Sequence, residues 1–118
     1  MGSLTDDSFK YLVLEKFKPD TPNMQLIHAA MGISGEAGEL VDCIKKHAIY
    51  GQELDISNLV EELGDIEFYL EALRQLLKIN REDILEANIR KLSVRYKSRF
   101  TTEESAARAD KLGESSHD

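Results

Sequence analysis

Hydrophobic residues recur along most of the chain at the three- and four-residue spacing of amphipathic helices. A first helix is predicted over residues 6–17, where Phe9, Val13 and Phe17 share one face and Asp6 or Asp7 provides the cap. The chain has only two prolines and no tryptophan, a composition that favours helices. The spacing and the composition together therefore favour an all-α protein.

A long second helix is predicted from Pro22, capped by Thr21, to about Tyr50, with Gly51 as its stop. One side carries a stripe typical of a core, while the other mixes small residues with acids. A glycine inside a helix costs on the order of 1 kcal/mol relative to alanine, so we expect either close approach of another backbone or a ligand, or a bend near Gly35. The predicted core stripe is Leu26, Ala30, Ile33, Ala37, Leu40, Ile44 and Ala48, and the mixed side is Ala29, Gly32, Glu36, Glu39 and Cys43.

A third helix is predicted over residues 57–77 from a regular apolar stripe. Projected at the helical period, Glu62 falls at the edge of this stripe and Asp65 lies beside it. Ionised carboxylates at a buried edge are costly without a partner, which separates these two acids from the others of the helix. The stripe is Leu59, Leu63, Ile66, Leu70, Leu73 and Leu77, and solvent-exposed positions are expected for Glu61, Glu67 and Glu71.

A fourth helix is predicted over residues 81–98, with Asn80 as its cap. Asn88, Lys91 and Arg95 recur at helical spacing and share one side of it. A cationic row on an acidic protein suits phosphate oxygens. A solvated basic face that balances the acidic helices explains the same pattern equally well.

Short connections between the predicted helices favour antiparallel packing of neighbours. The predicted fold is all-α, an antiparallel bundle of four main helices. At 118 residues the chain is expected to form a single domain, 1–118. Its ordered core is expected over about 6–100, followed by a partly flexible tail over about 101–118. That tail is expected to hold a short helix over 103–111 and a disordered end over 113–118.

The overall charge and composition exclude several classes of function. A net charge of −7 argues against a nucleic-acid partner, because phosphate binding needs clustered cations. No apolar stretch has the length of a membrane span or the form of a signal peptide, so a cytoplasmic location is expected. The single cysteine, Cys43, cannot form an internal disulfide and is expected to be a small buried residue.

Two acidic pairs are the strongest candidates for chemistry: Glu36 with Glu39, and Glu62 with Asp65. Each pair has i,i+3 spacing, so its two carboxylates project from one side of a helix. If the pairs face each other, their charges repel unless a hard cation lies between them. Oxygen ligands alone suit Mg²⁺ or Mn²⁺ rather than zinc, and neither His28 nor His47 follows a Glu by three residues, as the Glu-x-x-His spacing of di-iron bundles would require. A carboxylate not used in ligation is able to orient an attacking water as general base.

The segment Gly35-Glu36-Ala37-Gly38-Glu39-Leu40, followed by Glu61-Glu62-Leu63-Gly64-Asp65-Ile66, resembles the MazG-type all-α nucleoside triphosphate pyrophosphohydrolases. That family's pattern is EExxE, a spacer and ExxD, and the likeness covers roughly residues 22–110. Here Gly35 stands where the family has the first Glu of its doublet. The resemblance implies that Glu36, Glu39, Glu62 and Asp65 are the metal ligands and catalytic acids.

The resemblance also implies a reaction and an assembly. The expected enzyme is a Mg²⁺-dependent nucleotide pyrophosphohydrolase that cleaves (d)NTP to (d)NMP and pyrophosphate with a metal-activated water. A homodimer or homotetramer with sites completed across subunits is expected, which agrees with the small-residue side of the second helix. The implied nucleotide contacts are Asn88 and Lys91, with Lys46 and Tyr96 in addition, and Arg95 joins them through its place in the polar row.

Three alternatives stay open. The first is a related pyrophosphohydrolase acting on phosphoribosyl-ATP or a modified nucleotide. The second is a non-enzymatic helical oligomer whose acids bind a structural cation or a partner protein. The third is a helical bundle with acidic spacing that arises by chance. Substrate profiling tests the first, and metal-dependent melting without nucleotide-dependent stabilisation would mark the second.

Overall fold

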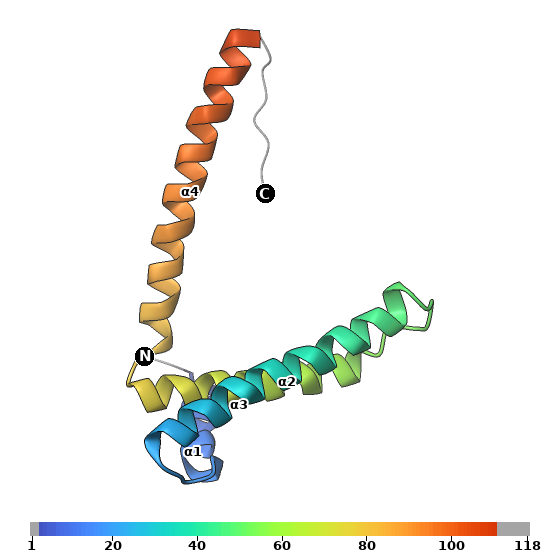
Figure 1. Ribbon diagram of the computed structural model, residues 1–118, viewed down its shortest axis with the longest axis vertical. Coiled ribbons are helices and arrows are strands. Elements are labelled where there is room, and N and C mark those ends of the chain that lie inside the picture. Colours follow the sequence, from blue (N-terminus) through green and yellow to red (C-terminus); the bar gives the residue numbers. More distant parts are fainter. Residues whose placement is uncertain (1–2, 111–118) are drawn as a thin grey trace. The chain divides into compact units, whose positions relative to one another are not determined.

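The computed structural model describes the backbone of residues 3–110 and the side chains of residues 3–95. Four helices follow one another: α1 (Leu4–Lys16), α2 (Pro22–Ala48), α3 (Ile56–Leu77) and α4 (Arg81–Asp110) (Figure 1). The described residues contain no strand, so the all-α prediction is confirmed. The chain divides into two compact units, Met1–Ile79 with α1 to α3 and Asn80–Asp118 with α4.

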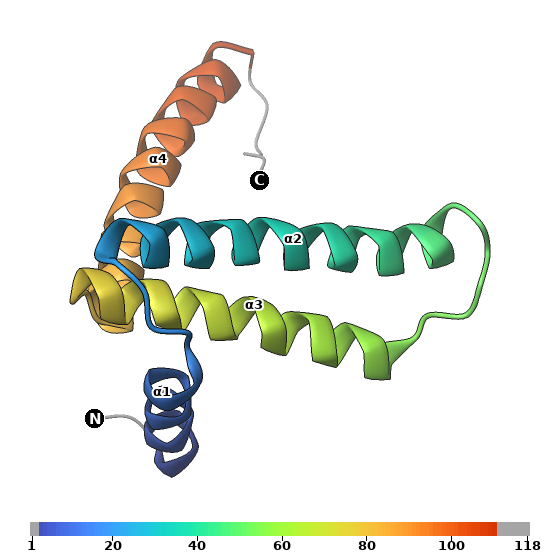
Figure 2. The ribbon, with the colours of Figure 1, turned by 60° about the horizontal axis from the view of Figure 1, so that its bottom comes forward.

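The first unit is built on α2 and α3, which lie side by side and antiparallel in both views (Figures 1 and 2). The reversal between them uses Gly51, whose φ of 72° suits a residue without a side chain. Helix α3 then begins where the Asp55 carboxylate accepts a hydrogen bond of 3.0 Å from the backbone N–H of Asn58. Helix α2 continues unbroken past Gly35, so the bend considered for that position does not occur.

The side of α2 that packs against α3 differs from the predicted core stripe. Ala29 and Cys43, placed on the mixed side, are buried, whereas Ala30, Ile44 and Ala48 of the predicted stripe are exposed. Ala29 is buried because it packs with Val13 of α1 and Ala72 of α3, so the buried side of α2 depends on which other helices cover it. The prediction for Ala30, Ile44 and Ala48 was therefore wrong.

A small core forms where the three helices of the first unit meet. Val13 of α1, Ala29 of α2 and Ala72 of α3 are buried together. Helix α1 begins earlier than predicted, because Ser3 is the cap and forms a capping box with Asp6. The prediction of Asp6 or Asp7 as the cap was wrong. Partly buried side chains complete the core: Phe9, Phe17, Phe68, Leu73 and Leu76.

One acid of α3 contradicts the predicted pattern of exposure. Glu71, expected to point into solvent, is only 4% exposed. Its Oε1 accepts a hydrogen bond of 2.9 Å from Nε of Arg74 and lies 2.8 Å from Nη2 of the same guanidinium, and its Oε2 accepts a hydrogen bond of 2.8 Å from Gln75. Gln75 also donates to the carbonyl of Lys10 at 2.9 Å, which ties α1 to α3. Helix α1 covers this side of α3, and the local partners i+3 and i+4 make burial of the charge tolerable.

The second unit is a single long helix over its described part. Asn80 caps α4, as predicted, by accepting a hydrogen bond of 3.0 Å from the backbone N–H of Asp83. The prediction of a separate short helix over 103–111 was wrong, because α4 runs without interruption to Asp110. The predicted disordered end, 113–118, lies outside the described residues. Among the described helices, none combines the length and apolar composition that a membrane crossing requires.

Candidate metal centre

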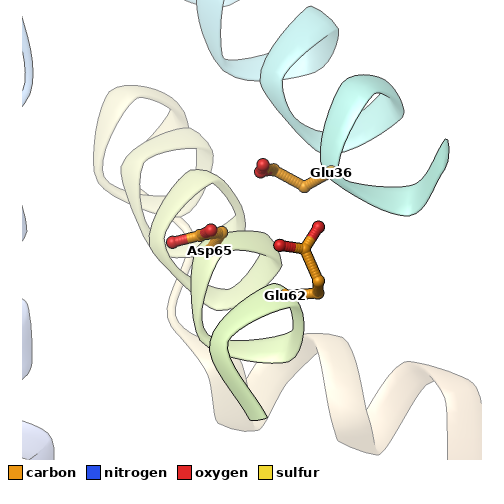
Figure 3. A group of neighbouring side chains, drawn as sticks. All are labelled: Glu36, Glu62 and Asp65. Atoms are coloured by element: carbon orange, nitrogen blue, oxygen red, sulfur yellow. The ribbon is translucent and has the colours of Figure 1, made fainter. Parts of the chain in front are cut away.

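Three of the four predicted acids meet between α2 and α3. Glu36 comes from α2, Glu62 and Asp65 come from α3, and each offers one carboxylate oxygen within 4.8 Å of the other two. Figure 3 shows the three side chains as neighbours, with Glu36 extending from α2 and Glu62 and Asp65 extending from α3. The antiparallel pairing of α2 and α3 brings together residues that are 26 or more positions apart in the chain. We call Glu36, Glu62 and Asp65 the acid cluster.

The acid cluster lacks the partners that buried carboxylates normally have. Glu36 and Glu62 are half-buried, and the Oε2 atom of each is buried without a hydrogen-bond partner among the described residues. Burial raises the pKa of the Glu62 carboxyl, and the neighbouring charges of Glu36, Glu39, Asp65 and Glu61 raise that pKa further. Such an arrangement is unfavourable for the protein alone.

The donor set and spacing of the acid cluster fit a hard divalent cation. Metal–oxygen distances of roughly 2.0–2.6 Å place oxygens that share one ion within about 4–5 Å of each other. The separations of at most 4.8 Å meet this limit. All donors are carboxylate oxygens, the ligands that Mg²⁺ and Mn²⁺ prefer. A bound ion would also offset the charge of two carboxylates that each have a buried oxygen without a hydrogen-bond partner, so the residues present fit such an ion.

Glu39 lies outside the acid cluster. It follows Glu36 by three positions in α2, is exposed, and is absent from the group of oxygens within 4.8 Å. Its charge nevertheless contributes to the raised pKa of Glu62. The described side chains thus bring together three of the four predicted ligands, and Glu39 stays a predicted ligand and catalytic acid at their margin.

The predicted substrate contacts lie elsewhere in the chain. Lys46 is ten positions beyond Glu36 on α2, roughly 15 Å along a helix axis, and its Nζ lies 3.3 Å from Oδ2 of Asp42. On α4, the side chains of Asn88, Lys91 and Arg95 are exposed, and that of Tyr96 lies outside the described residues. Their roles in binding a nucleotide stay predictions.

One feature beside the acid cluster was not singled out from the sequence. The ring of Tyr69 lies against the backbone of Gly32, where a Cβ would overlap three of its ring carbons. Tyr69 follows Asp65 by one helical turn and Gly32 precedes Glu36 by one turn, so this contact forms the next layer of the α2–α3 interface. The signal available in the sequence was the matching four-residue spacing of Gly32 to Glu36 and of Asp65 to Tyr69.

Comparison with known proteins agrees with the chemistry of this site. The family model for the MazG nucleotide pyrophosphohydrolase domain matches residues 26–100, which include all four predicted acids. Comparisons with curated proteins and with solved structures give no match. The family match spans more than half of the chain and contains the acid cluster on both of its helices. The chain therefore belongs to the MazG nucleotide pyrophosphohydrolase family.

Proposed function

We propose that the protein is a Mg²⁺-dependent pyrophosphohydrolase that converts a nucleoside or deoxynucleoside triphosphate into the monophosphate and pyrophosphate. The observation that carries this proposal is the acid cluster, in which two buried carboxylate oxygens lack any partner among the described residues. Membership of a nucleotide pyrophosphohydrolase family supports the class of substrate.

In this proposal Glu36, Glu62 and Asp65 hold the metal, with Mn²⁺ as the alternative ion. A bound divalent ion neutralises phosphate charge and lowers the pKa of a coordinated water. The acids themselves cannot bind a triphosphate, because like charges repel. The acid cluster can therefore bind the phosphate groups of the substrate only through a cation.

Glu39, predicted from the sequence as both a metal ligand and a catalytic acid, takes only the catalytic role in this proposal because it lies outside the acid cluster. Because it is exposed at the margin of the acid cluster, its carboxylate remains free to accept a hydrogen bond from the attacking water. As the water oxygen bonds to phosphorus and the bond between the α- and β-phosphate groups breaks, Glu39 takes the proton. Pyrophosphate leaves with the electrons of the broken bond.

Product analysis tests the function. The protein is incubated with each NTP and dNTP in Mg²⁺, and the products are separated by ion exchange. Monophosphate and pyrophosphate in equal amounts are expected with at least one nucleotide. Orthophosphate as the only inorganic product, or no turnover with any nucleotide, would overturn the proposal. Phosphoribosyl-ATP belongs in the same panel, because its cleavage releases the same pyrophosphate.

Two variants separate the proposed roles of the acids. Glu62→Gln should lose both turnover and the thermal stabilisation by Mg²⁺, because it removes a ligand. Glu39→Gln should lose turnover by roughly 10²-fold or more, the usual contribution of a general base, but keep the Mg²⁺ stabilisation. Loss of helical circular dichroism in either variant would instead assign that acid a structural role.

We also propose that the protein assembles as a homodimer or homotetramer. Large apolar side chains are exposed on both long helices of the first unit, among them Met31 and Val41 on α2 and Val60 and Leu63 on α3. Apolar side chains that recur along two adjacent helices support an interface with another copy. Light scattering after size exclusion measures the mass, and a 13.3 kDa species at micromolar concentration would contradict this proposal.

A further inference from the structure

The acid cluster lies part of the way along the α2–α3 pair, so a nucleotide bound there has two directions in which to extend. In one direction the next layer holds Tyr69 of α3 on Gly32 of α2. In the other direction the partly or fully buried residues are Leu40, Cys43 and Leu59, which offer aliphatic and thiol groups. The two directions therefore differ in chemistry, and only the first presents an aromatic ring one turn from the acids.

The aromatic direction continues beyond Tyr69. The ring centroid of Tyr69 lies 5.8 Å from that of His28 and 5.3 Å from that of Phe68. His28 in turn stacks on Phe17, with centroids 4.7 Å apart and planes inclined by 25°. His28 is exposed and Tyr69 is half-buried, whereas Phe17 and Phe68 pack against the core. The four rings thus form one continuous cluster, in which His28 is exposed and the other three rings are half-buried.

The glycines of α2 show that the placement of Tyr69 is specific. Glycine lowers the stability of a helix relative to alanine at any interior position. At Gly35 and Gly38 an added Cβ would meet nothing within 4 Å, so packing requires no glycine there. At Gly32 the added Cβ would overlap the Tyr69 ring itself. Packing therefore explains the glycine at position 32: it lowers the stability of the helix but leaves room for the Tyr69 ring beside the acid cluster.

We propose that Tyr69 contacts the nucleobase of the bound nucleotide, that His28 extends this surface, and that Gly32 is the positioning residue that lets the Tyr69 ring lie there. The inference rests on the proposed function, because it takes the acid cluster as the phosphate end of the site. One helical turn, about 5.4 Å, separates the two layers, a distance that the sugar of a nucleotide bridges. Aromatic side chains stack on nucleobases, and this contact depends little on which base is present.

A binding comparison tests the inference. Affinities for α,β-methylene analogues of the four dNTPs and for inorganic triphosphate are measured by calorimetry in Mg²⁺. Tyr69→Leu should weaken the best-bound analogue by about tenfold or more, as expected for one lost base contact, and leave inorganic triphosphate within about twofold of the wild type. Gly32→Ala should show the same selective loss. Equal losses for both ligands, or none, would overturn the proposal.

Matched controls exclude a general effect of the substitutions. Tyr50→Leu makes the same change at a tyrosine that is 63% exposed beyond the end of α2. Gly38→Ala makes the same change at a helical glycine with open space beside it. Both control variants should bind the analogues as the wild type does. A loss with Gly38→Ala equal to that with Gly32→Ala would refute the positioning role of Gly32.

A measurement on the unmodified protein covers the case in which a Tyr69 variant fails to fold. The Tyr69 ring protons, assigned by comparison with Tyr69→Phe, should shift in the NMR spectrum on binding the best analogue but not on binding inorganic triphosphate. If the wild type hydrolyses nucleotides and these protons do not move, the inference fails and the proposed function stands. If the wild type hydrolyses no nucleotide, the proposed function fails and the inference with it.

Discussion

Glu62 and Glu71 lie nine positions apart on α3, and both place a carboxylate oxygen out of reach of solvent. Glu71 is surrounded by donors: Arg74 and Gln75 from the same helix bond to both of its oxygens. Glu62 instead faces Glu36 and Asp65, and its buried Oε2 has no partner among the described side chains. The same residue type in the same helix is thus compensated at one position and left uncompensated at the other.

The difference distinguishes a structural charge from a charge kept for a ligand. A buried carboxylate that only stabilises the fold needs hydrogen-bond donors within the protein, because burial removes its hydrogen bonds with water and these must be replaced. A carboxylate oxygen that binds a cation cannot also be paired with an arginine, because the guanidinium would compete with the ion for that oxygen. Helix α3 contains both solutions, which makes Glu71 an internal control for Glu62.

The largest effect is expected from Glu71→Ala, because it leaves the Arg74 guanidinium, whose side chain is 12% exposed, without its main partner. Breaking a buried pair in this way typically costs about 3–5 kcal/mol of unfolding free energy. The substitution also removes an acceptor of Gln75, which holds α1 through the Lys10 carbonyl. Urea unfolding followed by circular dichroism measures the loss. A change below about 1 kcal/mol would show that the contacts of Glu71 contribute little.

The next effect is the response to a divalent cation. At a Mg²⁺ concentration one hundred times its dissociation constant, binding to the folded state alone adds about 2.7 kcal/mol to the unfolding free energy. We expect this gain in the wild type and in Glu71→Gln, and its loss in Glu62→Gln and Asp65→Asn. Thermal melting with and without EDTA provides the measurement. An equal gain in Glu62→Gln would remove the distinction between the two carboxylates.

The sequence predicted the acid cluster better than it predicted the surroundings of the cluster. Spacing alone placed Glu62 and Asp65 on one side of a helix at a buried edge. The paired helices bring both acids to Glu36, and Glu62 is half-buried, but Asp65 is exposed. Periodicity failed at Glu71, because exposure there depends on α1, which packs against α3 from a distant part of the chain. A helical projection describes one helix and contains no information on which other helix covers it.

The packing face of α2 shows the same limit. Counting apolar residues favoured Ile44 and Ala48, but the helix pair buries Ala29 and Cys43 instead. The choice depends on how closely two backbones approach, and that distance is set by residues such as Gly32 together with the partner ring of Tyr69. Such a contact is a property of two segments, so neither segment alone predicts it.

A smaller effect should appear in the pH dependence of stability without metal. The pKa of Glu62 is raised above its ordinary value of 4.5, so the folded state retains this proton to higher pH than the unfolded state does. The contribution of Glu62 to stability therefore falls as pH rises from 4.5 through its folded-state pKa. In EDTA, the stability of the wild type minus that of Glu62→Gln should decrease over this range. A flat or rising difference would contradict the crowding of charges in the acid cluster.

The smallest effect is expected from Glu67→Gln, which removes the second acid near Arg74. The Glu67 side chain is 50% exposed, and its Oε1 lies 3.9 Å from Nη2 of Arg74, against 2.8 Å for Glu71. A partly exposed ion pair of this length contributes about 0–1 kcal/mol, because water screens it. The unfolding free energy of Glu67→Gln, measured in urea, should therefore lie within about 1 kcal/mol of that of the wild type and well above that of Glu71→Ala. If the two substitutions cost the same, the compensation on α3 would come from net charge around Arg74 rather than from the buried hydrogen bonds of Glu71.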